Sequence, residues 1–451
     1  MISCKNVLIT SLLLIISTIG IFGQIPVVTT PQPGTLSPGV NIGFPTNRSN
    51  PVPNVPAFPG FNNNNRQLEM FERDRLEVQL RNNAEIQRML NGDSEYFFSN
   101  RGIQYELPSC VGMPGTEHFY QTAEKLLDML SGKTQLNLKE AVFSVENAYF
   151  EGQLDRTKYE KAILEMLTIA QTKAKQDGLN WNNPITKNVM LFRVMSDTLK
   201  VKLPARESST VSYPMQYDFD DFWGEENRSK LFVTKLLAAH TGQCHSLPLL
   251  YLILCEAVGA EANLAFSPMH SYAKFKDQRG NWYNIELTQG RIVSDAFIIG
   301  SGFITTEAIK HSLYMEPQAR KQVIAHCLSD LASNYIHKYG YDKFVIQCAD
   351  SALHYAPGNI TALAIKSNYH SACFEYTVNQ VGWPPKDTLK VHYPRIYELM
   401  EERNDFYRKM DNMGYREMPK DIYEYWLNSL NEEKEKREHN EKYHKVLQFV
   451  K

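Results

Sequence analysis

The sequence of 451 residues predicts an α+β fold in which one helix and an antiparallel sheet form a core between two helical sections. Apolar residues recur at helical spacing through most of residues 66–224 and again beyond residue 320, whereas two or three β-type runs occupy residues 262–287. Hydrophobic residues make up 43% of the chain, which is enough for buried cores. The length corresponds to two or three domains of about 150 residues each.

The charge balance and the cysteines exclude several classes of protein. The chain has 48 Lys and Arg residues against 50 Asp and Glu residues, whereas nucleic-acid-binding proteins carry a strongly basic face. Seven cysteines with no CxxC pair are too sparse for a disulfide scaffold and do not form a metal knuckle. We therefore expect that the protein binds no nucleic acid, no metal and no cofactor. Most cysteines should be buried, although one isolated disulfide bond is possible.

The first 23 residues have the pattern of a signal peptide. Sixteen uncharged residues, 7–22, follow Lys5, and the small residues Gly20 and Gly23 lie near the end of this run. The run is shorter than the ~20 residues that a spanning helix needs. We expect cleavage near Gly23, export to the periplasm or the medium, and no membrane span in the mature protein. An uncleaved N-terminal anchor is the alternative.

The next two segments are predicted to be a linker and a helical section. Residues 24–65 are rich in Pro, Asn, Gly, Thr and Ser, a composition typical of a disordered spacer. Residues 66–224 are expected to be mainly helical, and we assign no chemistry to them. The helices are expected at 66–91, 116–130, 138–150, 155–176 and 187–199.

Residues 225–320 form the predicted α+β core, and residues 321–451 form a second helical section. The core should contain a helix at 228–240, an apolar helix at 249–258, and β-type runs at 262–266, 270–276 and 281–287. The turn sequence 277–280 predicts a hairpin between the last two runs. In the second section, Ala352, Pro357 and Asn359 follow a helical stretch from Lys343 in the pattern of one tetratricopeptide repeat, and a charged helix follows Glu432.

Cys244 is the candidate nucleophile. It follows a glycine and is predicted to open the apolar helix, whose first turn suits Pro248 because the N–H groups there have no partner within the helix. A sulfur at the N-terminus of a helix lies in positive partial charge, which favours the thiolate. Taken alone, Cys244 could equally be a packed cysteine at a helix end.

His270 and Glu286 are the candidate partners of this cysteine. A turn centred near Gln278 places them directly opposite each other across the hairpin, on one face. A carboxylate there orients the imidazole and stabilises its protonated form, as a cysteine–histidine pair requires. A register shift of one residue would separate them. Taken alone, His270 could be a strand-end hydrogen-bonding residue and Glu286 a solvated strand residue.

Three short segments resemble the transglutaminase-like superfamily: GQCHS at 242–246, PMH at 268–270 and WYNIELT at 282–288. The resemblance covers about a fifth of the chain, and the closest group is the bacterial branch in which tetratricopeptide repeats follow this core. It implies a papain-like core, with a nucleophilic cysteine on a helix packed against an antiparallel sheet that carries histidine and an acid. By position, Cys244 matches the nucleophile, His270 the base and Glu286 the acid, where most members carry aspartate.

The resemblance implies a peptidase or amidase that acts on peptide or protein substrates. Cys244 would attack the carbonyl, His270 would transfer the proton, and backbone N–H groups near Cys244 would hold the oxyanion. Gln243 and Trp282 are further candidates for the substrate or oxyanion site. Hydrolysis is favoured over cross-linking because water reaches an exported site freely. The alternative is a catalytically silent scaffold, whose core binds an extended peptide and whose helical repeats bind a partner protein.

Overall fold

The computed structural model describes residues 102–203, 209–300, 303–419, 421–429 and 432. The predicted signal peptide, the linker, the helix at 66–91 and the helix after Glu432 lie outside these residues. The described chain is an α+β structure that consists mostly of helices and has a small antiparallel sheet, so the coarse fold class is confirmed. None of the helices in the described ranges combines the length and the hydropathy needed to cross a bilayer.

Four helices form the N-terminal part of the described chain, close to their predicted positions. Side chains cap three of them: Asn137 accepts a hydrogen bond from the N–H of Glu140, and Asp155 and Asn183 cap the next two helices in the same way. The last helix begins and ends three residues earlier than predicted, because a proline follows its cap directly. The helices are α5 (Thr116–Ser131), α6 (Leu138–Tyr149), α7 (Arg156–Gln176) and α8 (Pro184–Ser196).

The section up to residue 224 is less purely helical than predicted. β1 (Leu199–Val201) pairs antiparallel with β2 (Thr210–Ser212), and β3 (Gln216–Tyr217) pairs parallel with β4 (Thr241–Gly242). The helix predicted at 228–240 is divided into a 3₁₀ helix, η1 (Arg228–Leu231), and α9 (Val233–Ala239). The break occurs because the buried carboxylate of Glu146 accepts the N–H groups of Val233 and Thr234 at the start of α9.

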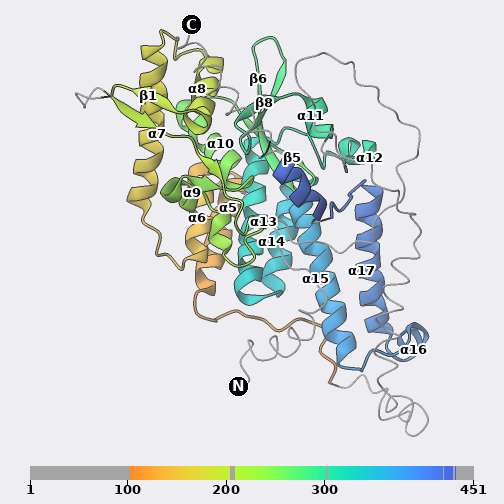
Figure 1. The fold of residues 1–451 in the computed structure, drawn as a ribbon. Coiled ribbons are helices and arrows are strands. Elements are labelled where there is room, and N and C mark those ends of the chain that lie inside the picture. The colour runs from red at the N-terminus through yellow and green to blue at the C-terminus, as the bar shows by residue number, and fades with distance from the viewer. Residues whose placement is uncertain (1–101, 204–208, 301–302, 420, 430–431, 433–451) are drawn as a thin grey trace.

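The core consists of α10 (Ser246–Val258) and a four-stranded antiparallel sheet. The strands follow one another in the sheet in chain order, and α10 contacts β5 and β6 (Figure 1). The first ten residues of α10, 246–255, are all buried, so this helix lies inside the molecule. The strands are β5 (Asn263–Ser267), β6 (His270–Lys276), β7 (Trp282–Glu286) and β8 (Arg291–Val293), of which β8 was not predicted.

The hairpin of β6 and β7 forms as predicted, but its register differs by two residues. Ala273 pairs with Ile285, so Glu286 lies level with Tyr272 and diagonally from His270, not directly opposite it. The turn is centred one residue later than expected, because the N–H of Gly280 bonds to the carbonyl of Asp277. A shift of two residues leaves every side chain on its original face of the sheet, so the two side chains still share one face.

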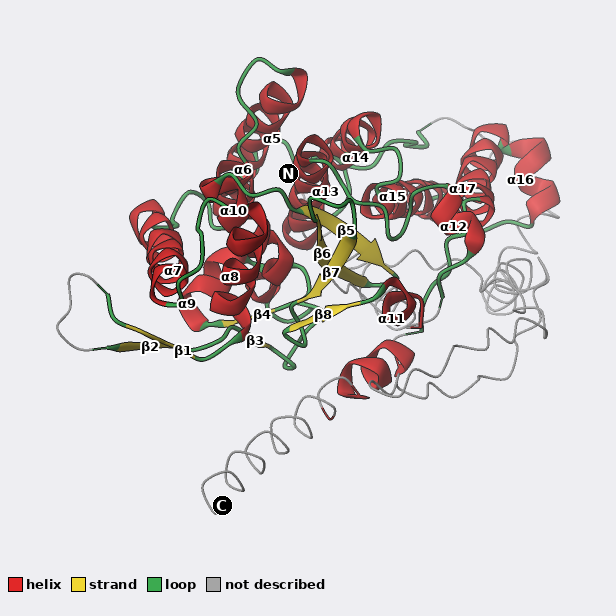
Figure 2. Cartoon of the chain, turned by 90° about the horizontal axis from the view of Figure 1, so that it is seen from above, coloured by secondary structure: helices red, strands yellow, loops and turns green. Residues whose placement is uncertain are grey.

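Helices from both ends of the chain share one hydrophobic core, which runs in sequence from Cys110 to Leu427. α13 packs against α5 and α6 on one side and against α14 on the other (Figure 2). α14 begins at the predicted position, and Asn359 caps α15 after the turn that contains Pro357. The C-terminal elements are α11 (Asp295–Gly300), α12 (Thr306–Lys310), α13 (Arg320–Tyr339), α14 (Lys343–Tyr355), α15 (Ile360–Asn379), α16 (Lys386–His392), α17 (Pro394–Asn412) and a helix at 421–429.

Candidate active site

Cys244 lies in the turn that joins β4 to α10. The helix starts at Ser246, two residues later than the prediction that Cys244 opens it. The N–H of Leu247 already bonds to the carbonyl of Gln243 at 3.0 Å, so the first helical turn encloses the cysteine. The thiol therefore lies at the N-terminal end of α10, and the side chain is only 1% exposed.

Two contacts fix the position of this turn. A Cβ atom added to Gly242 would lie 2.6 Å from the Ser246 hydroxyl, so glycine is required for the close approach of β4 to α10. The Ser271 hydroxyl donates a hydrogen bond to the carbonyl of Cys244 at 2.6 Å. Because Ser271 is the residue after His270, this bond holds the cysteine turn beside the start of β6.

His270 and Glu286 form a buried pair. Nε2 of His270 lies 2.6 Å from a carboxylate oxygen of Glu286, and the two residues are 3% and 1% exposed. The other carboxylate oxygen accepts the N–H of Thr288 at 2.9 Å, which fixes the orientation of the carboxylate. Burial disfavours the charged imidazolium, but the charge of Glu286 and hydrogen bonds to Cys244 and Glu286 outweigh burial and raise the pKa of His270 to about 10.

A tight turn presents His270 at the very start of β6. Ser267 pairs with His270 across β5 and β6, so only Pro268 and Met269 connect the two strands. Met269 has a φ of 56°, an uncommon value for a residue other than glycine. The backbone is therefore held in an unfavourable conformation at the residue before the candidate base.

The thiol of Cys244 lies beside the ring of His270. Nδ1, the second ring nitrogen, is buried and makes no hydrogen bond of ordinary length to a described residue. After burial and the charge of Glu286, the interaction of the ring with the thiol of Cys244 has the next largest effect on the pKa of His270, and it raises this pKa. The structure thus brings sulfur, imidazole and carboxylate together in that order, although the three residues come from two separate segments.

The other two predicted site residues lie differently. Gln243 is next to the cysteine and fully buried, but its amide nitrogen donates to the carbonyl of Asp218 at 2.8 Å, so this group is already engaged. Trp282 starts β7, four residues and about 13 Å along the strand from Glu286. It is 39% exposed and contacts Lys274 and Lys276 through its ring. The structure does not bring Trp282 to the site.

Four aromatic residues that the sequence analysis did not assign to the site surround the sulfur and the imidazole. The Tyr423 hydroxyl lies 3.6 Å from Sγ of Cys244, and the Trp426 ring meets His270 edge-on with centroids 5.1 Å apart. Trp223 packs on Tyr423 at 4.9 Å. Burial, and then the nearby Cys244, raise the pKa of both Tyr217 and Tyr423, so both phenols stay protonated. The one sequence signal for this cluster is the spacing of Tyr423 and Trp426, since residues three apart lie on the same face of a helix.

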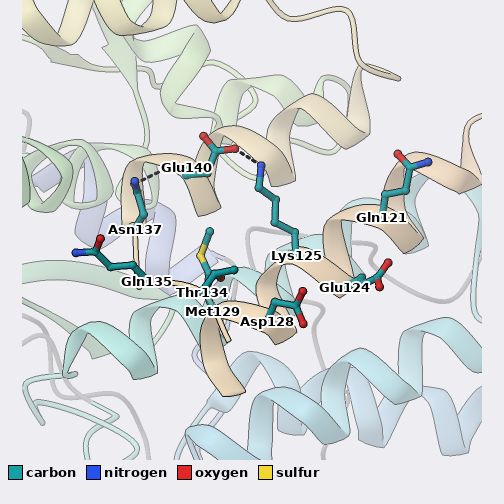
Figure 3. Close-up of a pocket in the computed structure, with 9 residues that line it drawn as sticks. All are labelled: Gln121, Glu124, Lys125, Asp128, Met129, Thr134, Gln135, Asn137 and Glu140. Carbon is teal, nitrogen blue, oxygen red and sulfur yellow. Dashed lines mark hydrogen bonds and ion pairs between the residues drawn. The ribbon is translucent and has the colours of Figure 1, made fainter. Parts of the chain in front are cut away.

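A surface pocket of about 400 Å³ lies elsewhere, between α5 and α6 (Figure 3). Lys125 and Glu140 point toward each other there and form an ion pair, and Asp128 is paired with Lys133. None of the side chains that line this pocket belongs to the Cys244 site. Within the described ranges, no group of three or more His, Cys, Asp or Glu side chains is arranged to hold a metal ion.

The arrangement at Cys244 has the parts that nucleophilic catalysis by a thiol needs. A sulfur at a helix N-terminus lies beside a ring that can take its proton, and a buried carboxylate fixes that ring. The six described cysteines are all buried, and none of them forms a disulfide bond with another described residue. Comparisons with protein-family models, with curated proteins and with solved structures gave no match to this chain.

Proposed function

We propose that this chain is a cysteine-dependent amide hydrolase, a peptidase or amidase, with a papain-like core of the transglutaminase-like superfamily. The observation that supports the proposal best is the buried contact of 2.6 Å between His270 and Glu286, beside the thiol of Cys244. A purely structural histidine at this depth would not need an ionised partner, because burial favours its neutral form. A pair that keeps the ring charged suits a thiolate neighbour.

The reaction follows from these positions. The thiolate of Cys244 attacks the carbonyl carbon, a C–S bond forms, and backbone N–H groups at the start of α10 stabilise the oxyanion. His270 then gives its proton to the leaving amine as the C–N bond breaks, which leaves a thioester. Next, His270 takes a proton from water, the hydroxide attacks the thioester, the C–S bond breaks, and the carboxylic acid is released as the thiolate of Cys244 and the protonated ring of His270 are restored. Glu286 keeps the ring oriented throughout.

The setting of the enzyme is part of the proposal. We propose that the chain is exported through its first 23 residues and that its substrates are peptides or proteins outside the cytoplasm. We also propose that the stacked helices α13, α14 and α15 are tetratricopeptide-like and bind a partner protein, because consecutive helices packed side by side leave a continuous surface.

The direct test is turnover by Cys244→Ala on a panel of peptides and cell-envelope substrates. Cys255→Ala is the matched control, because Cys255 is a buried cysteine of α10, the helix that follows Cys244, and it lies outside the proposed triad. We expect the first variant to lose about 1,000-fold or more of the activity and the second to keep most of it. Because Tyr423 and Trp426 cover the site, both substitutions are made in a parent that carries Tyr423→Ala and Trp426→Ala, and equal turnover by this parent and its Cys244→Ala variant would refute the proposed enzyme activity.

The second candidate function is a catalytically silent binding module. One observation favours it: Tyr423 and Trp426 cover the sulfur and the imidazole, so the closed structure admits no substrate. In this case no substitution that uncovers Cys244 would produce turnover, although a peptide would still bind to the uncovered surface. The two candidates therefore differ in the behaviour of an uncovered variant.

A further inference from the structure

The helix at 421–429, the covering helix, lies directly on the proposed site. In Figure 1 it is the dark-blue helix in front of β5. Tyr423 contacts the sulfur of Cys244, and Trp426 contacts the ring of His270. The covering helix thus reaches two of the three reactive groups, although at least 150 residues separate it from them in sequence.

The position of the covering helix is incompatible with catalysis. A carbonyl carbon has to come within about 3–3.5 Å of the attacking sulfur before the reaction. The Tyr423 hydroxyl, at 3.6 Å from Sγ, already occupies that approach. The side chains of His270 and Glu286 are also almost completely buried. A substrate can therefore reach the sulfur only after Tyr423 has moved away.

The attachment of the covering helix is apolar. Its inner face consists of Tyr423, Trp426 and Leu427, whereas Tyr425, on the outer face, is 52% exposed. Within the described part of the chain, no ion pair links this helix to the body. The connection from Tyr415, which packs in a second core, includes Met418, which is 2% exposed and packs in the main core. Displacement of the helix therefore starts after Met418 and needs no change in α17.

The surface under Tyr423 holds its aromatic ring between other aromatic side chains. Trp223 and Phe222 pack on the ring with centroids 4.9 Å and 5.9 Å away, and Tyr217 lies beside its hydroxyl. Aromatic rings that meet in this way bind one another more strongly than the buried area alone predicts. These three residues belong to the body of the protein and remain when the covering helix leaves.

We propose that the covering helix is an internal pseudosubstrate, and that the site of Phe222, Trp223 and Tyr217 binds an aromatic side chain of the peptide substrate once the helix is displaced. The second part rests on the proposed function, whereas the first part concerns only the access to Cys244. Peptides that carry tyrosine or phenylalanine next to the scissile bond are the expected substrates. The wild-type chain is then a latent form whose activity depends on displacement of residues 421–429.

The test measures the rate at which iodoacetamide alkylates Cys244 in the full-length chain, by mass spectrometry of the peptide that contains it. We expect the double variant Tyr423→Ala, Trp426→Ala to react about 100-fold faster than the wild type, because it lacks the two side chains that hold the helix closed. Tyr425→Ala, on the outer face of the same helix, should react at the wild-type rate. Equal rates for all three proteins would overturn the proposal.

Two further measurements exclude general unfolding as the cause. Cys255 serves as the internal control, because its alkylation has to stay slow if the body remains folded. A synthetic peptide of residues 419–430 should slow the alkylation of Cys244 in the double variant, and the same peptide with Tyr423→Ala and Trp426→Ala should not. If the double variant fails to fold, hydrogen exchange of the wild type tests whether the covering helix is displaced from the folded body. Amides of residues 423–427 should exchange about 100-fold faster than those of α10, and equal protection would refute displacement.

The aromatic site is tested by protection and by turnover in the double variant. Short peptide amides that contain tyrosine should protect Cys244 from alkylation, whereas the alanine analogues should not, and Trp223→Ala should abolish the difference. If Cys244 of the double variant is alkylated rapidly and is protected by the tyrosine peptides, but no peptide is hydrolysed, the covering role of the helix is supported and the proposed enzyme activity is refuted. If the wild type hydrolyses peptides and its Cys244 is already alkylated rapidly, the proposed enzyme activity is supported and the pseudosubstrate role of the helix is refuted.

Discussion

Replacing Glu286 with glutamine tests the electrostatic argument for the site. The substitution keeps the shape of the side chain and removes the charge that lies 2.6 Å from His270. Two opposite charges centred about 4 Å apart attract each other by about 4 kcal/mol at an effective dielectric constant of 20. This energy corresponds to about 3 pKa units. Removing the charge should therefore lower the pKa of His270 from about 10 by about 3 units, because burial then opposes the charged ring and only Cys244 and the remaining hydrogen bond favour it.

The assay is a pH titration followed by NMR of ¹³C-labelled histidine. The chain has 12 histidines, and the spectrum of His270→Asn identifies the signal of His270 by its absence. Glu261→Gln is the control, because Glu261 is an exposed glutamate outside the site. A pKa of His270 that stays within about one unit of the wild-type value in Glu286→Gln would show that the carboxylate does not hold the charge on the ring.

The same pair makes the free energy of unfolding depend on pH. The pKa of His270 is about 10 in the folded chain and about 6.5 in the unfolded chain, so between these values only the folded state holds the proton. The stabilisation is complete below pH ~6.5 and is lost as the pH rises toward 10. Urea unfolding at several pH values should show this decrease in the wild type, and the decrease should be much smaller in Glu286→Gln.

Three further substitutions test the packing and the limits of the site. Leu250→Ala, in the fully buried part of α10, should lower the free energy of unfolding by about 2–5 kcal/mol, whereas Leu164→Ala, exposed on α7, should change it by less than about 1 kcal/mol. Asn359→Ala removes the cap of α15 and a buried hydrogen bond to Ser329, and a loss below about 1 kcal/mol in urea unfolding would contradict its role. Trp282→Ala, introduced into the Tyr423→Ala, Trp426→Ala double variant, should change the rate of hydrolysis by less than about twofold, because the Trp282 ring lies outside the site. A large loss of rate would support the predicted role of Trp282 in substrate binding.

Local elements were predictable because their signals lie within a few residues. The helices that follow Asn137, Asp155 and Asn359 begin where a capping side chain precedes an apolar periodic run. The hairpin could be placed from its turn sequence between two β-type runs, since Asp277 accepts the N–H of Gly280 within a single turn. Each of these contacts joins residues close in sequence, so the pattern of the chain contains it.

The candidate site was predictable only in part. The order and spacing of Cys244, His270 and Glu286 indicated one cleft, and the structure places the three side chains together. The register was wrong by two residues, because turn sequences fix the position of a turn only to within a residue. Gln243 and Trp282 were chosen by their closeness in sequence, which does not determine where a side chain points.

The sequence by itself determined the helices α5 to α8 and α10, the hairpin, and the face of the sheet that carries His270 and Glu286. Only the tertiary structure decided that β3 pairs parallel with β4 and that Tyr423 lies on Cys244, 179 residues away in sequence. Helix and strand periodicity reports which side of an element is apolar, and it does not report which partner covers that side. The packing of the whole chain selects the partner, and here it places an aromatic helix face over the proposed nucleophile.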